Sequence, residues 1–166
     1  RTAKVKVAQR GPDGALEPLG AEVARLEAVR DALGPGGRVR VDANGAWDVD
    51  DAVRALTELE LAARRGGLEG LEYVEQPCAT VADLAALRRR VDTRIAADES
   101  VRLPGDADAV VAAGAADIIV LKVAPLGGVR ACLEIAEKAG LPVVVSSAME
   151  SSVGLAAGLA LARALP

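Results

Sequence analysis

The segment Val39-Arg40-Val41-Asp42-Ala43-Asn44 shows the pattern that decides the fold, because a short run of β-branched residues ends in an acidic residue. The same pattern recurs in two later runs that end at Glu75 and Asp98. Lysine takes the corresponding place in two further runs, as Lys6 and Lys122. Short apolar runs bounded by turn residues are typical of buried strands. We therefore expect charged side chains at the ends of several strands.

Strands and helices are expected to alternate along the chain. The predicted strands are residues 3–7, 38–42, 71–75, 94–98, 117–122 and 142–146. The predicted helices are residues 20–33, 48–64, 80–91, 106–114, 127–139 and 151–164, approximately. Asp48 and Thr80 suit the N-cap positions of two of these helices, and Ser151 or Ser152 suits that of a third. Regular alternation indicates a parallel sheet, because the right-handed crossover between parallel strands needs a helix on its return path.

Two architectures fit a parallel α/β sheet, an open doubly wound sheet and a closed (β/α)8 barrel of the TIM type. A barrel gathers all its strand ends around one mouth, whereas an open sheet uses mainly those at its switch point. Polar strand ends recur along the whole chain, so we predict the barrel. About six of its eight βα units are expected within a single domain, residues 1–166. One strand would be missing at each end, which would leave sheet edges exposed.

Composition excludes several classes of function. Of the 166 residues, 24 are acidic and 20 are basic, so no basic surface indicates nucleic-acid binding. No apolar run approaches the roughly 18 residues that a membrane span needs. Cys78 and Cys132 fit no metal-ligand spacing, which favours a reducing, cytoplasmic setting. Nothing in the composition indicates an oligomeric state.

The strand-end residues suit one kind of chemistry. Three carboxylates without histidine or thiolate ligands favour Mg²⁺, with Mn²⁺ as an alternative. Such a metal stabilises the enolate that forms when a proton is removed next to a carboxylate. Lys6 and Lys122 flank the three acids in sequence, so one lysine would face each side of a substrate. Lysine acts as a base where burial or a nearby cation lowers its pKa.

Helix capping is the alternative explanation for these acids. Asp42 and Asn44 would then cap the helix that follows them, and Asp98 or Ser100 would cap the next one. Glu75 resists this explanation, because its helix starts several residues later. The two lysines resist it too, since a lysine that ends an apolar parallel strand has no easy route to solvent. As a set, the five residues favour the catalytic interpretation.

Five motifs in order resemble the enolase superfamily in its muconate-lactonizing-enzyme subgroup, over essentially the whole chain. They are Lys4-Val5-Lys6, Asp42-Ala43-Asn44, Glu75-Gln76-Pro77, Asp98-Glu99-Ser100 and Lys122 before Val123-Ala124-Pro125-Leu126-Gly127-Gly128. Within the subgroup, residues 124–128 and 145–154 resemble the actinobacterial o-succinylbenzoate synthase family. The N-terminal capping domain of the superfamily is not recognisable, so we do not expect this chain to be fully active alone.

The resemblance implies a role for each candidate residue. Asp42, Glu75 and Asp98 would bind Mg²⁺, while Lys6 would act as base and then acid and Lys122 as a stabilising cation. The expected supporting or substrate-binding residues are Lys4, Asn44, Gly127, Gly128, Ser146 and Ser147. The glycine and serine pairs would offer backbone N–H groups to a small carboxylate substrate. The implied reaction dehydrates 2-succinyl-6-hydroxy-2,4-cyclohexadiene-1-carboxylate to o-succinylbenzoate, a step of menaquinone biosynthesis.

Three other functions stay open from the sequence. Racemisation of N-acylamino acids or epimerisation of dipeptides would use the same two lysines. A phosphate-binding barrel would use Gly127-Gly128 and would need no metal. A non-catalytic interaction fragment would merely retain the motifs.

Overall fold

The computed structural model describes residues 1–65, 67 and 69–165. Within them lie six strands, β1 (Thr2–Lys6), β2 (Arg38–Asp42), β3 (Leu71–Glu75), β4 (Ile95–Ala97), β5 (Ile118–Lys122) and β6 (Val143–Ser146). A helix follows each strand: α1 (Leu19–Leu33), α2 (Val49–Arg65), α3 (Val81–Arg88), α4 (Asp106–Ala112), α5 (Val129–Ala139) and α6 (Ser152–Ala164). Every predicted strand and helix is confirmed. The largest shift is at α3, which ends at Arg88 because a turn closes there, with Arg90 N–H donating to the Leu87 carbonyl.

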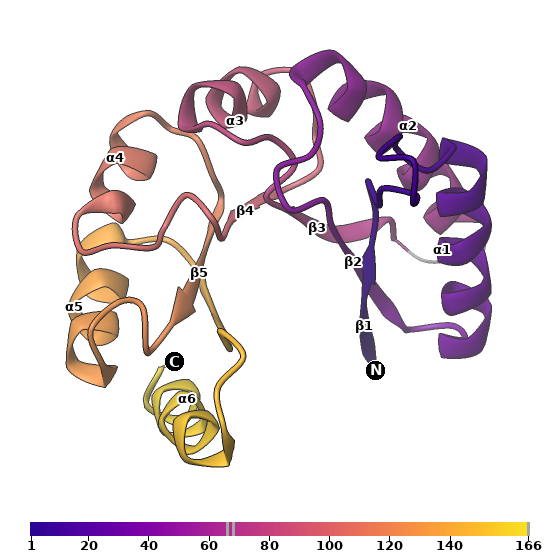
Figure 1. Ribbon diagram of the computed structural model, residues 1–166. Coiled ribbons are helices and arrows are strands. Elements are labelled where there is room, and N and C mark those ends of the chain that lie inside the picture. Colours follow the sequence, from indigo (N-terminus) through magenta and orange to yellow (C-terminus); the bar gives the residue numbers. More distant parts are fainter. Residues whose placement is uncertain (66, 68, 166) are drawn as a thin grey trace.

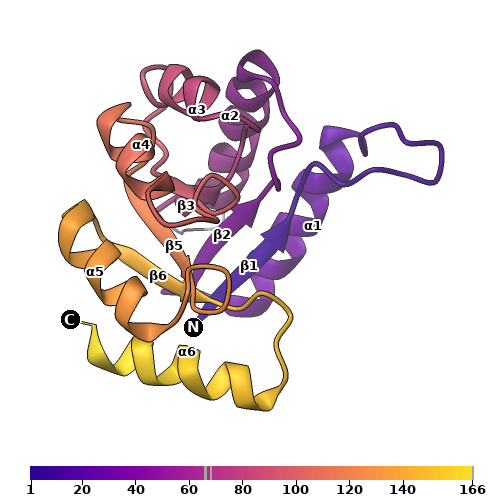
Figure 2. The same cartoon turned by 60° about the vertical axis from the view of Figure 1, so that its left-hand side comes forward.

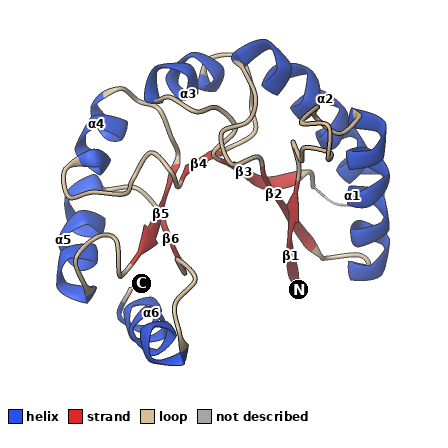
Figure 3. Ribbon diagram, viewed as in Figure 1, coloured by secondary structure: helices blue, strands red, loops and turns tan. Residues whose placement is uncertain are grey.

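The strands pair in the order β1-β2-β3-β4-β5-β6, and every pair is parallel. They form a curved inner wall, and the helices lie outside it (Figures 1 and 3). Among the described residues, β1 and β6 each pair with one neighbour only, so the ring is open between them. The predicted TIM-type barrel is therefore confirmed as a half-barrel of six βα units.

The main core lies between the sheet and its surrounding helices. On α2, Ala52, Leu56, Leu59 and Ala63 recur at helical spacing on one side, and all are buried. They belong to the same core as Val41, which points outward from β2. Each fully buried leucine contributes about 2 kcal/mol relative to an exposed one. This packing fixes the strands that carry the charged residues.

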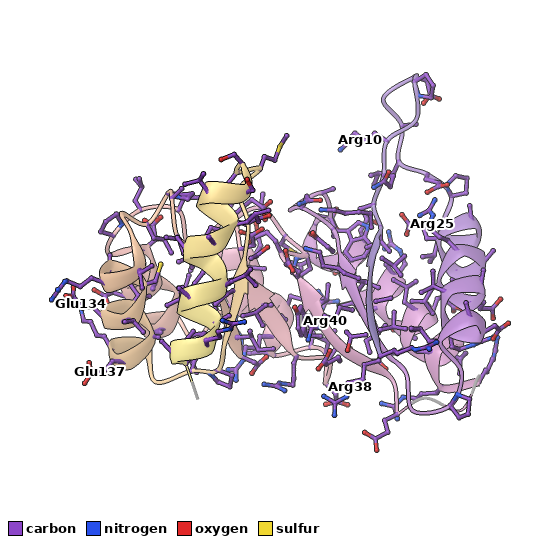
Figure 4. The ribbon with its side chains drawn as sticks, turned by 90° about the horizontal axis from the view of Figure 1, so that it is seen from below. Arg10, Arg25, Arg38, Arg40, Glu134 and Glu137 are labelled. Atoms are coloured by element: carbon purple, nitrogen blue, oxygen red, sulfur yellow. The ribbon has the colours of Figure 1, made fainter. Side chains whose placement is uncertain are left out.

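The concave face of the sheet holds a second, smaller cluster, formed by Tyr73, Ala96, Ile118 and Val120. The Arg40 guanidinium lies 4.8 Å from the centre of the Tyr73 ring. Its Nε donates to a carboxylate oxygen of Glu72 at 2.6 Å. In Figure 4, Arg38 and Arg40 extend from β2 between the two halves of the open ring. The charged strand ends therefore lie above a floor of packed side chains.

The loop between β1 and α1 projects from the body of the molecule as an arm, residues 8–18 (Figure 2). A short antiparallel bridge joins Arg10 to Leu16 within it. At its base, the Arg25 guanidinium donates to the Lys6 carbonyl at 3.0 Å. Helix α1 thereby helps to fix the backbone at the end of β1. Among the described residues, no helix combines the length and the apolar character needed to cross a bilayer.

Candidate active site

The charged strand ends lie at one end of the sheet. Lys6 is in register with Asp42, and Asp42 is in register with Glu75. Asp98 directly follows β4, and Lys122 closes β5. Because residues in register on parallel strands present their side chains on the same face, these groups converge on the concave side. The strand order places the three carboxylates between the two lysines, as the sequence predicted.

Ammonium groups make short contacts with these carboxylates. Lys6 Nζ lies 2.5 Å from Asp42 Oδ2, and Lys122 Nζ lies 2.6 Å from Asp98 Oδ2. Lys4 bridges two acids, at 3.0 Å from Asp42 Oδ2 and 2.8 Å from Glu75 Oε1. Lys4 therefore supports the carboxylate row directly. Lys6 and Lys122 contact opposite ends of that row.

All three carboxylates are almost fully buried, with exposed fractions of 1% for Asp42 and 2% for Glu75 and Asp98. Burial by itself raises a carboxylate pKa. At Asp42, hydrogen bonds from Lys6 and Lys4 outweigh burial and hold the pKa below its ordinary value. At Glu75, burial, with the charge of Asp42 and of Asp98, keeps the pKa above its ordinary value despite the bond from Lys4. Burial is therefore the main reason that the charged form of Glu75 is disfavoured.

The donor chemistry fits a hard divalent cation. Asp98 Oδ1 is buried and accepts no hydrogen bond within the part of the chain that the structure describes. The Arg102 guanidinium Nη2 lies 3.9 Å from Asp98 Oδ1, so a bound cation would give this oxygen a closer partner and would stabilise the buried charge of Glu75. Among the described residues, no three Asp, Glu, His or Cys side chains already stand at the spacing that one ion needs. Lysine ammonium groups stand among the carboxylates instead.

Backbone strain gathers at the same end of the sheet. Four non-glycine residues of the described chain have positive φ: Ala8 (55°), Asn44 (46°), Gln76 (37°) and Met149 (63°). Each lies within three residues of the end of a strand. Such conformations cost about 1–3 kcal/mol each and tend to cluster at functional sites. The strain therefore supports a functional role for this end of the sheet.

Gln76 is a positioning residue that the sequence analysis did not single out. Its side chain is fully buried, and its Oε1 accepts from the backbone N–H groups of Asp98 at 2.9 Å and Ser100 at 3.1 Å. Its Nε2 donates to the Cys78 carbonyl and to Ser100 Oγ. Gln76 thus ties the end of β3 to the end of β4 and places Asp98. Its position after Glu75 was the only available signal.

Asn44 contacts the proposed base. Its Oδ1 accepts from Lys6 Nζ at 2.6 Å, and its Nδ2 donates to Glu99 Oε1 at 3.0 Å. Its backbone N–H donates to Asp42 Oδ1 at 3.0 Å. Asn44 therefore links a carboxylate of the row to Lys6.

The helix-capping alternative is wrong for these residues. Helix α2 is capped by Asp48, whose Oδ1 accepts from Asp51 N–H at 2.7 Å. Before α4, the residue that accepts from loop N–H groups is Asp106. Neither Asp42 nor Asp98 serves the start of a helix.

The Gly127-Gly128 pair lies in the turn after β5, and both residues have positive φ. Gly127 N–H donates to the Ala124 carbonyl and Gly128 N–H to the Val123 carbonyl. The expected donation of these groups to a substrate is therefore not supported, because the turn already satisfies them. The same two N–H groups are equally unavailable to a phosphate.

Ser146 and Ser147 are placed differently. They line a cavity of about 250 Å³ at the end of β6, which also contacts α6. A larger cavity, about 420 Å³, lies near Leu71 and Arg94, where β3 and β4 begin. It is remote from the charged strand ends and has no evident part in their chemistry. The serine cavity lies between the end of β6 and α6, and Ser146 itself is in register with Lys122.

Comparison with known proteins agrees with this geometry. Similar curated proteins are the o-succinylbenzoate synthases of Thermobifida fusca, 64% identical over 165 residues, and of Mycobacterium tuberculosis (strain H37Ra), 56% identical over 166 residues. The alignments cover 99% and 100% of this chain but 48% and 47% of those proteins. The chain thus spans about half the length of the curated relatives it matches.

Similar solved structures share the fold. The L-Ala-D/L-Glu epimerase from Bacillus subtilis matches with a TM-score of 0.84 at 31% identity, over 99% of this chain and 44% of that one. Muconate lactonizing enzyme from Pseudomonas putida matches with a TM-score of 0.83 at 31% identity, over the same shares. The family model described as "Enolase C-terminal domain-like" matches residues 1–166. The chain therefore belongs to the enolase C-terminal domain-like family.

Proposed function

We propose that this chain forms part of the barrel domain of a Mg²⁺-dependent o-succinylbenzoate synthase. The observation that carries the proposal is the order Lys6, Asp42, Glu75, Asp98, Lys122 across one sheet end. The high identity to synthases over the whole chain supports the choice of substrate. Residues 1–166 would belong to one domain. The free thiols of Cys78 and Cys132 agree with a reducing, cytoplasmic setting.

In this proposal, Asp42, Glu75 and Asp98 hold Mg²⁺, with Mn²⁺ as a substitute. The ion, when bound, supplies positive charge that offsets the negative charge developing on the substrate carboxylate. Lys6 Nζ removes the proton from the carbon next to that carboxylate. It then returns a proton to the departing hydroxide, so that one C–H bond and one C–O bond break and water leaves. Lys122 stabilises the developing anion from the opposite side.

The surroundings of Lys6 fix its position and leave it accessible. Lys6 Nζ is held by Asp42 and Asn44, so its direction is fixed before a substrate arrives. The lysine side chain is 47% exposed, so a substrate can reach it. Lys122 is only 11% exposed, which suits a fixed cation rather than a group that exchanges protons with solvent. The two lysines therefore suit different roles.

A side-by-side assay tests the proposal. The complete protein is given the cyclohexadiene carboxylate, an N-succinylamino acid and a set of dipeptides, with and without excess chelator. We expect dehydration at a kcat/KM at least about a hundredfold above the other two reactions, since specific sites discriminate through the transition state. Chelator should abolish it. Faster racemisation or epimerisation would assign the alternative function, and unchanged turnover in chelator would refute the metal.

A further inference from the structure

The proposed mechanism gives Glu99 no role, although this residue lies beside the carboxylate row. It directly follows Asp98 and lies in the turn after β4. Its Oε1 accepts from Asn44 Nδ2 at 3.0 Å and lies 3.4 Å from Arg102 Nη2. Within the described residues, its Oε2 is buried and has no hydrogen-bond partner. A buried carboxylate oxygen without a hydrogen-bond partner is unfavourable for stability, so a role in function has to be considered for Glu99.

The contacts of Glu99 continue through Asn44 to Lys6. Glu99 accepts from the amide nitrogen of Asn44, and the amide oxygen of Asn44 accepts from Lys6 Nζ. The side chains therefore connect in one line, from carboxylate through amide to ammonium. The backbone of Asn44 is fixed as well, since its N–H donates to Asp42 Oδ1.

These two hydrogen bonds set the orientation of the Asn44 amide. A carboxylate only accepts hydrogen bonds and an ammonium only donates them. Glu99 on one side and Lys6 on the other therefore allow only one of the two amide orientations. Reversing the amide would set its oxygen against the carboxylate and its nitrogen against the ammonium. Without Glu99, the single bond from Lys6 is the only side-chain contact of these that keeps the amide oxygen facing the ammonium.

We propose that Glu99 is a positioning residue that holds Lys6 through the amide of Asn44. The inference rests on the proposed function, in which Lys6 moves the proton. Glu99 does not touch the substrate in this account, so its loss should slow the chemical step and leave substrate and metal affinity nearly unchanged. Reach matters more than charge, because the contact is one hydrogen bond to an amide.

Three substitutions in the complete protein test this. Glu99→Gln keeps an oxygen that can accept from Asn44, Glu99→Asp keeps the charge but is one methylene too short, and Glu99→Ala removes both. We expect kcat to fall about 10- to 100-fold in the alanine and aspartate variants, as for other residues that orient a functional group. The glutamine variant should stay within about threefold of the unmodified protein. KM and the Mg²⁺ dissociation constant should change less than about twofold in all three, because uniform binding is untouched.

Glu134→Ala is the matched control, because Glu134 is exposed on α5, on the outside of the molecule (Figure 4). Unchanged kcat in Glu99→Asp and Glu99→Ala would overturn the proposal. A glutamine variant as slow as the aspartate variant would overturn it too, since charge would then be what matters. If the alanine variant fails to fold, comparison of the aspartate and glutamine variants still tests the proposal.

A second measurement separates this inference from the proposed function. In the complete protein, ¹⁵N-asparagine labelling reports on the Asn44 side-chain amide, whose signals are identified by their loss in Asn44→Ala. The amide signals should move in Glu99→Asp and return toward their original positions in Glu99→Gln. If the complete protein does not dehydrate the cyclohexadiene carboxylate, the proposed function fails while this readout still tests the contact. Signals unmoved in Glu99→Asp would refute the contact itself.

Discussion

The β2–β4 part of the sheet and the β6–α6 edge differ in how deeply their side chains are buried. Strand β4 is fully buried along its length, whereas all four residues of β6 are only half-buried. On α6, Val153 is 81% exposed and Leu159 is 64% exposed. The loop before it leaves Met149 entirely exposed. One side is a packed wall, and the other is an open margin.

The two regions carry different parts of the proposed reaction. The three carboxylates belong to the packed side, and Lys6, on the edge strand β1, is held to it by its ion pair with Asp42. The serine pair lies at the open margin, beside a cavity of about 250 Å³. Rigid elements hold reacting groups more accurately than loops do. We expect the reacting groups on the packed side, and we expect Ser146, which is in register with Lys122, to contact the substrate without moving a proton.

Replacing Lys6 should have the largest effect. In Lys6→Ala the proposed base and acid is lost, so kcat should fall by about a thousandfold or more. Mg²⁺ affinity should remain, because the three proposed carboxylate ligands are unchanged. Steady-state kinetics and calorimetric metal titration measure the two quantities. Lys138→Ala is the control, since Lys138 pairs with Asp108 on an exposed surface. A Lys6 variant with near-normal kcat would show that Lys6 is neither the base nor the acid of the reaction.

Gln76→Ala should be the most destabilising of the changes proposed here. It leaves the backbone N–H groups of Asp98 and Ser100 without their buried acceptor. Each such loss costs about 1–3 kcal/mol, so the free energy of unfolding should fall by about 3 kcal/mol. Urea denaturation measures it. Gln9, the other glutamine of the sequence, is exposed, so Gln9→Ala should change stability by less than about 0.5 kcal/mol. Equal effects of the two changes would contradict the role of Gln76 in tying the end of β3 to the end of β4.

The fold and the charged row could be predicted because they depend on local, repeated signals. A parallel strand places its last residues at a common edge, so Asp42, Glu75 and Lys122 could be assigned to one site without knowing any contact. Thr80 was also predictable as a cap, and its Oγ1 accepts from Asp83 N–H at 3.1 Å. Ser151 occupies the N-cap of α6 as expected, but its side chain makes no capping hydrogen bond.

The remaining contacts depend on residues far apart in sequence and on unusual backbone conformations. Gln76 reaches Ser100, which is 24 residues away, from a backbone with positive φ that no local pattern indicates. Glu99 resembles an ordinary surface acid until Asn44 is found beside it, 55 residues away. The sequence led us to expect that the backbone N–H groups of Gly127 and Gly128 donate to a substrate, because the hydrogen bonds within their turn are not visible in sequence.

Asp117 tests whether ion pairs contribute to the rigidity of the packed side. It accepts from the Arg88 guanidinium at 2.6 Å and from Ile95 N–H at 2.9 Å. Burial alone would raise the pKa of Asp117, but these bonds outweigh it and lower the pKa from its ordinary value of 3.8. The stabilisation is therefore present above pH 3.8 and is lost as the pH falls through the lower, folded-state value.

The Arg88 side chain is 42% exposed, so solvent screens the pair and Asp117→Asn should cost at most about 1 kcal/mol at neutral pH. Urea denaturation at pH 7 and well below pH 3.8 measures the difference between the variant and the unmodified protein. The difference should shrink at the lower pH. A difference that stays the same at both would show that the charge of Asp117 is not what stabilises this side.

Ser146→Ala should have the smallest effect and should appear in KM alone. If Ser146 contacts the substrate without moving a proton, losing one neutral hydrogen bond of about 1 kcal/mol should raise KM about fivefold. The value of kcat should stay within about twofold, because no reacting group is touched. Ser151→Ala is the control, since that side chain makes no capping bond. A fall in kcat without a change in KM would place Ser146 with the reacting groups, and the division between packed side and margin would fail.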